Sequence, residues 1–128
     1  MKIKLLLIMG IIATLLGSCS SSKGFTSVGV DKFESYIAQP GVQLVDVRTP
    51  SEYLEGHLEG AQNIDVKGDN FVEQAQARLD RRKPVAVYCR SGRRSAMAAQ
   101  QLVKVGYKVT NLDGGIIDWQ VAGKKTVK

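Results

Sequence analysis

Residues Pro84–Ser95 read PVAVYCRSGRRS, and this stretch decides the fold. The run Pro84–Tyr88 is almost entirely apolar, which is typical of a β-strand covered on both faces. Cys89 follows the strand directly, Gly92 permits a tight loop, and Ser95–Val105 has a helical pattern. The stretch therefore predicts a buried strand, a short loop around one cysteine, and a helix.

Strands and helices alternate on both sides of this stretch. Further strands are expected at Val42–Val47, Ala61–Ile64 and Lys108–Leu112. Helices are expected from Val30 up to Pro40, at Ser51–Leu54, over Asn70–Arg81, and around Ile116–Trp119. In the first helix, Asp31 and Glu34 have the spacing of a capping box. This alternation predicts an α/β fold: a central parallel β-sheet of about five strands with helices on both faces.

The first 24 residues differ from the rest of the chain. Lys2 and Lys4 precede an apolar stretch from Leu5 to Leu16, and small residues lead to Cys19. This is the pattern of a secretory signal, and the stretch is shorter than the ~20 residues of a membrane-spanning helix. Small residues before a cysteine resemble the bacterial lipobox, which implies cleavage before Cys19 and a lipid on it. A plain secretory signal with an incidental cysteine is the alternative.

Three segments are predicted: a lipoprotein signal peptide at 1–18, a lipidated cysteine with a short tether at 19–24, and a folded domain at 25–128. The expected location is the bacterial cell envelope, facing the periplasm, with the membrane reached through the lipid on Cys19. The pattern does not decide between the inner and the outer membrane. The tether Ser20–Gly24 spans at most roughly 17 Å, so the domain is expected to stay close to its membrane.

The distribution of charge argues against binding to nucleic acid, and the small number of histidine and cysteine residues argues against a metal site. The 128 residues carry a net charge of +6, and loss of Lys2 and Lys4 leaves 16 of the 18 basic residues against 12 acidic ones. Outside the Cys89 loop the basic residues are scattered without interleaved aromatic residues, which argues against nucleic acid. One histidine and one remaining free cysteine are too few for a zinc site, so no metal is expected.

The Cys89 loop has the features of an anion cradle. In parallel sheets ligands bind beyond the carboxyl ends of strands, and Cys89 lies at such an end. The following helix presents free N–H groups, and Arg90, Arg93 and Arg94 add positive charge. Both influences lower the pKa of a thiol, so a reactive thiolate is predicted. The alternative is a merely structural buried cysteine with solvated arginines.

Two blocks of sequence resemble the rhodanese-like domain family. The first is DVRTPSEY at 46–53 followed by GHLEGAQNI at 56–64, and the second is CRSGRRS at 89–95 followed by GY, NLDGG and Trp119. The resemblance runs from about Phe25 to Gly123. It implies a sulfurtransferase without a cofactor, in which Cys89 takes sulfur from a small anion such as thiosulfate and passes it to a thiol or cyanide acceptor. The implied substrate-binding loop comprises Arg90, Ser91, Gly92, Arg93, Arg94 and Ser95.

Details of this loop bear on substrate choice. Arg90 matches the thiosulfate-using members of the family, whereas Arg93 departs from the apolar residue that is commoner there. The family also contains phosphatases, whose loops place an arginine six residues after the cysteine. Here Ser95 holds that position and Arg94 comes one residue early, which favours the smaller sulfur-transfer loop. A module that carries persulfide but turns over little free thiosulfate is a second hypothesis.

Three residues outside the loop have candidate roles. Asp46 and Arg48 end a strand near the same edge and are expected either to position the loop or to form a structural ion pair, the latter being favoured. His57 is the single histidine, but it lies in a turn between Gly56 and Leu58, and a pre-ionised thiol needs no base. A structural role is expected for it.

Overall fold

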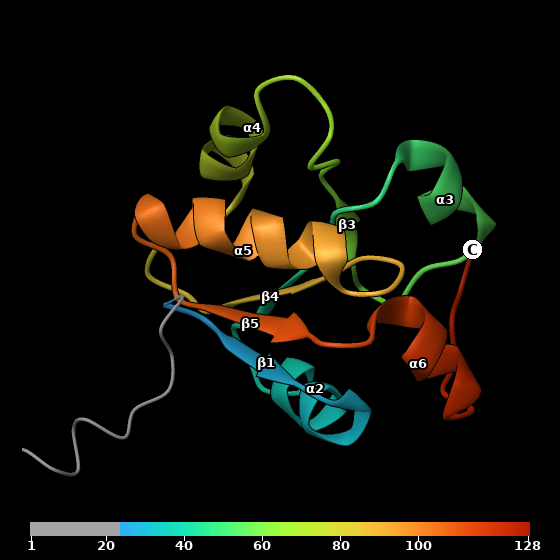
Figure 1. Ribbon diagram of the computed structural model, residues 1–128. Helices are drawn as coiled ribbons and strands as arrows, with labels where there is room; N and C mark the ends of the chain where they lie inside the picture. The colour runs from blue at the N-terminus through green and yellow to red at the C-terminus, as the bar shows by residue number, and fades with distance from the viewer. Residues whose placement is uncertain (1–23) are drawn as a thin grey trace, which may run out of the picture.

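The computed structural model describes residues 24–128 and is shown in Figure 1. The strands are β1 (Thr26–Val28), β2 (Gln43–Asp46), β3 (Gln62–Asn63), β4 (Val85–Tyr88) and β5 (Val109–Leu112). The helices are α2 (Val30–Ile37), α3 (Pro50–Glu55), α4 (Phe71–Arg78), α5 (Arg93–Lys104) and α6 (Gly115–Val121). The predicted signal peptide and Cys19 lie outside the described residues.

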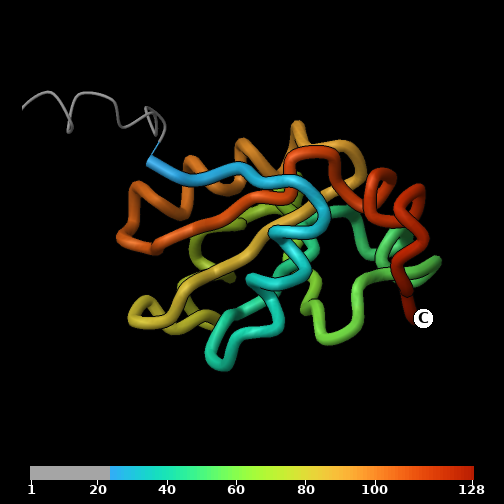
Figure 2. Tube along the Cα trace, turned by 90° about the horizontal axis from the view of Figure 1, so that it is seen from below, coloured from blue at the N-terminus to red at the C-terminus, as the bar shows by residue number. Residues whose placement is uncertain are grey.

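The strands form one parallel sheet in the order β1-β5-β4-β2-β3. The predicted α/β class and five-stranded parallel sheet are confirmed. Because all strands run the same way, the loops that follow β2, β3, β4 and β5 meet at one edge. Figure 2 shows β4 in the middle of the sheet, so the loop that follows it lies at the centre of that edge.

Helices cover both faces of the sheet. On one face α4 and α5 pack against β2, β4 and β5 through a core that includes Val87, Ala99 and Leu102. On the other face Phe33 of α2 and Trp119 of α6 pack on the sheet together with other buried residues. Adjacent residues along β4 alternate between these two cores, which explains why the whole strand is apolar. Burial on both sides fixes the end of β4 rigidly.

Helix capping differs from the sequence-based prediction. The Asp31 side chain makes no cap: Gly29 is the N-cap of α2, and no side chain caps that helix. The capping box lies instead at the start of α3, where Thr49 accepts a hydrogen bond from the N–H of Glu52 and the Glu52 carboxylate accepts one from the N–H of Thr49. Pro50 at the first helical position supports this start.

Two other boundaries differ from prediction. Helix α5 begins at Arg93, two residues before the expected start at Ser95, so Arg93 and Arg94 belong to its first turn. Helix α4 ends at Arg78 rather than at Arg81, because Leu79 has extended backbone angles. Between residues 24 and 128 no helix is long and apolar enough to span a membrane.

The C-terminal residues fold back onto the turn after α3. His57 and Val127 exchange two backbone hydrogen bonds of 2.9 and 2.8 Å as an isolated antiparallel bridge. The indole N–H of Trp119 donates to the carbonyl of Lys125 at 2.9 Å. The C-terminus therefore lies beside α3, as Figure 1 shows.

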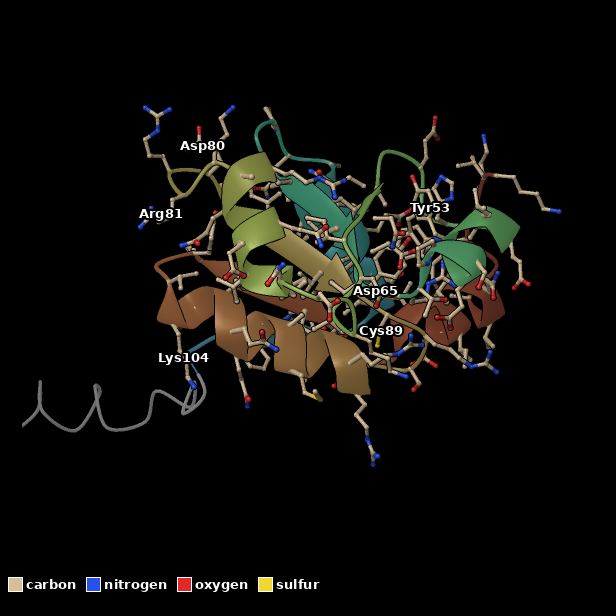
Figure 3. The ribbon with its side chains drawn as sticks, turned by 90° about the horizontal axis from the view of Figure 1, so that it is seen from above. Tyr53, Asp65, Asp80, Arg81, Cys89 and Lys104 are labelled. Carbon is tan, nitrogen blue, oxygen red and sulfur yellow. The ribbon has the colours of Figure 1, made fainter. Side chains whose placement is uncertain are left out.

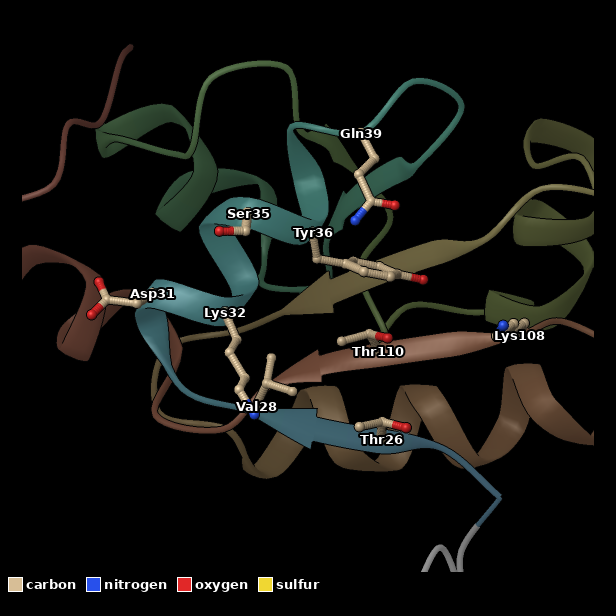
Figure 4. Close-up of a pocket in the computed structure, with 9 residues that line it drawn as sticks. All are labelled: Thr26, Val28, Asp31, Lys32, Ser35, Tyr36, Gln39, Lys108 and Thr110. Atoms are coloured by element: carbon tan, nitrogen blue, oxygen red, sulfur yellow. The ribbon is translucent and has the colours of Figure 1, made fainter.

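A cavity of about 560 Å³ lies between α2, β1 and β5, and Figure 4 shows its lining side chains. Tyr36 lies over Thr110 there, and its hydroxyl is buried without a hydrogen-bond partner among the described residues. Lys108 lines the cavity at the amino-terminal end of β5. No residue of the Cys89 loop lines it, so this cavity is separate from the candidate site.

Candidate active site

Cys89 lies immediately after β4 at the centre of the carboxyl edge of the sheet (Figure 3). Its residue surface is only 1% exposed, and it is a free cysteine. Asp65, which follows β3, lies on the same edge. The thiol predicted from the sequence is therefore placed where open parallel sheets bind ligands.

Hydrogen-bond donors of the loop converge on the sulfur. The N–H of Gly92 donates to Sγ of Cys89 at 3.1 Å. Burial by itself raises the pKa of the Cys89 thiol, but the Ser95 hydroxyl and the N–H groups of Ser95, Gly92 and Ser91 outweigh it and lower the pKa. The Ser95 hydroxyl oxygen lies 3.2 Å from the carbonyl oxygen of Gly92, so its single proton is donated either to that carbonyl or, when Cys89 is ionised, to the sulfur. The arrangement stabilises negative charge at one point.

The loop adopts this shape because both of its faces are closely packed. Gly92 has a φ of 108°, and a side chain there would overlap the carbonyl oxygen of Asp113. From α6, the N–H of Ile116 donates to the carbonyl of Cys89 at 2.9 Å and the N–H of Ile117 donates to that of Arg90 at 3.2 Å. The carbonyls are thus bonded away from the sulfur, which leaves the loop amides free to face it.

The three arginines do not surround the sulfur as expected from the sequence. Arg90 and Arg93 are exposed, and neither forms an ion pair among residues 24–128. Arg94 instead forms a two-bonded ion pair with Glu52, at 2.8 and 2.9 Å. Hydrogen bonds therefore make the largest contributions that lower the pKa of Cys89, and the charge of Arg94 acts on the sulfur as well, so of the two predicted influences the loop donors contribute more.

Glu52 is a site residue that sequence reasoning missed. Hydrogen bonds from Arg94, followed by those from Thr49, hold the pKa of Glu52 at about 2. Its Oε1 atom also accepts from the Thr49 hydroxyl at 3.0 Å. The pair joins residues 42 positions apart in the chain, so only the capping-box spacing of Thr49 and Glu52 could have drawn attention to it.

Asp46 and Arg48 form a buried ion pair beneath the loop. Their N–O distance is 2.7 Å, and the two side chains are 0% and 7% exposed. Tyr88, the residue before Cys89, donates its hydroxyl to Oδ2 of Asp46 at 2.7 Å and accepts the N–H of Leu58 at 3.0 Å. Burial, with the Asp46 charge, raises the pKa of Tyr88 and keeps it a donor. Through Tyr88, which directly precedes Cys89, the network ties the end of β4 to Asp46 of β2 and to Leu58.

His57 is held within a local structure. Its ring stacks on Tyr53 with centroids 3.7 Å apart, and Nδ1 lies 2.9 Å from the Tyr53 carbonyl oxygen. Its backbone carries the bridge to Val127. These contacts fit the structural role expected for His57.

A cleft of about 270 Å³ opens beside the loop, between α3 and α6. Arg90 and Glu52 line it together with Glu55 and Ile117. Ile117 is 37% exposed, so the cleft has both polar and apolar walls. Of the Cys89 loop, Arg90 lines this cleft.

The lowered pKa of Cys89 predicts a shifted pH profile for alkylation. Because the thiolate is the reacting form, the rate of carbamidomethylation by iodoacetamide should reach its plateau at lower pH in the folded protein than in urea-unfolded protein. The rate is measured by mass spectrometry of the Cys89 peptide from pH 5 to 10. Identical profiles for the two states would contradict the cradle.

Gly92→Ala should distort the cradle. Alanine at this φ would be strained and its Cβ would overlap the Asp113 carbonyl, which moves the N–H away from the sulfur. Loss of this hydrogen bond should raise the pKa of Cys89, and because each unit of rise lowers the thiolate fraction at pH 7 up to about tenfold, the alkylation rate at pH 7 should fall by up to that factor per unit. Gly123→Ala is the control, because Gly123 also has positive φ but a Cβ added there would meet nothing within 4 Å. Equal rates for the two variants would refute the steric argument.

Comparison with known proteins places this geometry in a family. Residues 29–122 match the family model described as rhodanese-like domain. The chain is 36% identical over 113 residues to thiosulfate sulfurtransferase 18 of Arabidopsis thaliana, covering 78% of this chain and 83% of that protein. It is 30% identical over 97 residues to the thiosulfate sulfurtransferase GlpE of Tolumonas auensis, covering 75% and 89% of the two chains.

Solved structures agree with these sequence matches. A rhodanese-related protein from Thermoplasma volcanium superposes with a TM-score of 0.70 at 28% identity, covering 80% of this chain and 98% of the other. The BH2092 protein of Bacillus halodurans gives a TM-score of 0.70 at 26% identity, covering 81% and 77%. With the matched fold, the loop after β4 and the family model over most of the chain, this protein belongs to the rhodanese-like domain family.

Proposed function

We propose that the protein is a sulfurtransferase that moves sulfane sulfur from thiosulfate or a similar donor to a thiol or cyanide acceptor through a persulfide on Cys89. The observation that carries the proposal is the hydrogen bond of 3.1 Å that the N–H of Gly92 donates to Sγ at the carboxyl edge of the sheet, together with the lowered pKa of Cys89. The sulfurtransferases among its relatives support the same reaction class.

The cradle supports both halves of such a reaction. In the first, the Cys89 thiolate attacks the outer sulfur of thiosulfate, a sulfur–sulfur bond forms, and sulfite leaves with the electron pair of the broken bond. In the second, cyanide or a thiolate attacks the outer sulfur of the persulfide, and the Cys89 thiolate leaves. Negative charge stays on sulfur throughout, where the amides of Ser91, Gly92 and Ser95 lower its free energy. No cofactor takes part in the proposed steps.

The experiment is turnover of thiosulfate and cyanide by the purified protein, followed as thiocyanate. Protein incubated with thiosulfate alone should gain the mass of one sulfur atom on the Cys89 peptide, and cyanide should remove it. A protein that neither gains sulfur nor forms thiocyanate from any sulfane donor would refute the proposal.

A persulfide carrier with low turnover of free thiosulfate is the second candidate. The Glu52–Arg94 ion pair favours it, because a paired guanidinium attracts a dianion less than a free one. Persulfide on Cys89 in protein isolated from cells, combined with slow thiosulfate turnover, would distinguish the carrier from an efficient enzyme.

We also propose a lipid anchor on Cys19, with the domain facing the periplasm. The support is the sequence alone: the basic start, the apolar stretch and the small residues before Cys19. Metabolic labelling with a fatty acid should mark the wild type and fail with Cys19→Ala. An unlabelled wild type would refute the anchor and leave the proposed reaction untouched.

A further inference from the structure

Arg94 is held in a fixed ion pair by an acidic partner. The guanidinium donates two hydrogen bonds to the two carboxylate oxygens of Glu52, at 2.8 and 2.9 Å. The side chains are only 18% and 26% exposed. Two bonds from Thr49 to Oε1 fix the carboxylate from the other side. Glu52 is therefore a rigid partner that sets where the charge of Arg94 lies.

Arg94 is also the arginine whose charge is coupled to the cradle. The negative charges of Glu52, Cys89 and Asp65 all act to raise its pKa, with Glu52 contributing most. Arg90 and Arg93 are exposed to solvent, where water screens their charges. The guanidinium on which the Cys89 charge acts thus already has a carboxylate in contact, and a second carboxylate, that of Asp65, lies on the same edge of the sheet.

We propose that Glu52 determines donor specificity: by holding and neutralising Arg94, it disfavours dianionic donors such as thiosulfate relative to monoanionic low-molecular-weight persulfides. This inference rests on the proposed sulfurtransferase function. The electrostatic reason is simple, since a dianion gains twice as much as a monoanion from any increase in positive potential at the cradle. Glu52 acts through Arg94 and is a positioning residue.

The favoured reaction balances without another reagent. A persulfide anion gives its outer sulfur to the Cys89 thiolate, a new sulfur–sulfur bond forms, and the donor leaves as a thiolate. One persulfide anion and one thiolate are consumed and one of each is formed. No oxidant, reductant or net proton transfer is needed. The same holds for thiosulfate, so the difference between the two donors on which the inference depends is their charge.

Glu52→Gln tests the proposal. Glutamine keeps an oxygen that can accept from Thr49 and is itself a capping-box residue, so α3 should persist. In this variant the charge of Arg94 is no longer neutralised, so kcat/KM should rise about tenfold for thiosulfate. For a small alkyl persulfide it should rise about threefold, because a monoanion gains half as much interaction energy with Arg94 as a dianion does. The gain should shrink as salt is added, because the pair is partly exposed.

Two further variants isolate the pairing. Glu55→Gln is the matched control: Glu55 lines the same cleft but forms no ion pair among residues 24–128, so its loss should change the ratio of the two kcat/KM values by less than about 1.5-fold. The double variant Glu52→Gln, Arg94→Gln removes one negative and one positive charge and so leaves the net charge unchanged. It should return the ratio of kcat/KM for thiosulfate to kcat/KM for the persulfide to the wild-type value. This double variant keeps the test decisive if the single one is unstable.

The outcomes separate the inference from the function. The inference would be overturned if Glu52→Gln changed kcat/KM for both donors by the same factor, lowered it for both, or changed it for neither. A merely structural role of Glu52 would not discriminate between donors by their charge. A ratio that stays raised in the double variant would overturn it as well. A wild type that takes sulfur from neither donor would instead refute the proposed function.

Discussion

Cys89→Ser is expected to lower thiosulfate–cyanide turnover by at least about 10⁴-fold, the scale on which enzymes lose activity when their nucleophile is removed. A serine hydroxyl in the same cradle is not ionised near neutral pH and cannot form a persulfide. The surrounding amides would still bind an anion, so thiosulfate should still protect the loop from proteolysis. Thiocyanate formation measures the loss of turnover, the mass of the residue 89 peptide shows that no sulfur is taken up, and the rate of loop cleavage with and without thiosulfate measures the protection.

Cys19→Ser is the matched control for this loss. It removes the other cysteine of the chain and leaves the loop unchanged, so turnover of the purified protein should equal that of the wild type. Turnover by Cys89→Ser above about a hundredth of the wild-type rate would show that sulfur transfer does not pass through Cys89.

Asp46→Ala is expected to destabilise the fold by about 3–5 kcal/mol, the usual cost of removing one partner from a buried ion pair. The Arg48 guanidinium would stay buried with its main partner lost, and the Tyr88 hydroxyl would lose its acceptor. Because Tyr88 precedes Cys89, the cradle should loosen at the same time. Urea unfolding followed by tryptophan fluorescence measures the free energy, since Trp119 is buried.

Two further variants identify the cause of the loss. Asp46→Ala combined with Arg48→Met removes both charges and should recover part of the lost stability, because no unpaired charge remains buried. Asp80→Ala breaks an exposed ion pair with Arg82, whose side chain is 89% exposed, and should leave stability unchanged. A double variant no more stable than Asp46→Ala would contradict the buried-charge explanation.

The sequence predicts the strand and loop well because local and global signals agree there. Residues of β4 alternate between two cores, so both faces of the strand are apolar. The sequence therefore shows a continuous apolar run, which is recognisable as a buried strand. The position of Cys89 at the end of a parallel strand then follows from topology. The short edge strand β1 leaves no such pattern, because Thr26 and Ser27 are exposed and polar.

The partner of Arg94 could not be predicted because the contact depends on tertiary structure. Three neighbouring cationic residues look alike in the sequence, and their different surroundings arise from where α3 and the first turn of α5 meet. Helix α5 begins before Ser95 because Gly92 is its N-cap, in a conformation that tight packing on Asp113 requires. The capping-box spacing and Gly92 are local signals, but neither shows which residue pairs with Arg94, so the sequence does not distinguish the environments of the three arginines.

The parallel sheet also sets the direction in which the protein presents its sulfur. Gly24, the first residue that the structure describes, comes just before β1 and therefore lies at the amino edge of the sheet, whereas Cys89 lies at the carboxyl edge. Four residues of strand separate these edges by about 13 Å. With the lipid anchor on Cys19 proposed above, this polarity would place the reacting sulfur at the edge of the sheet opposite to the chain entry, on the side that donors and acceptors reach from water.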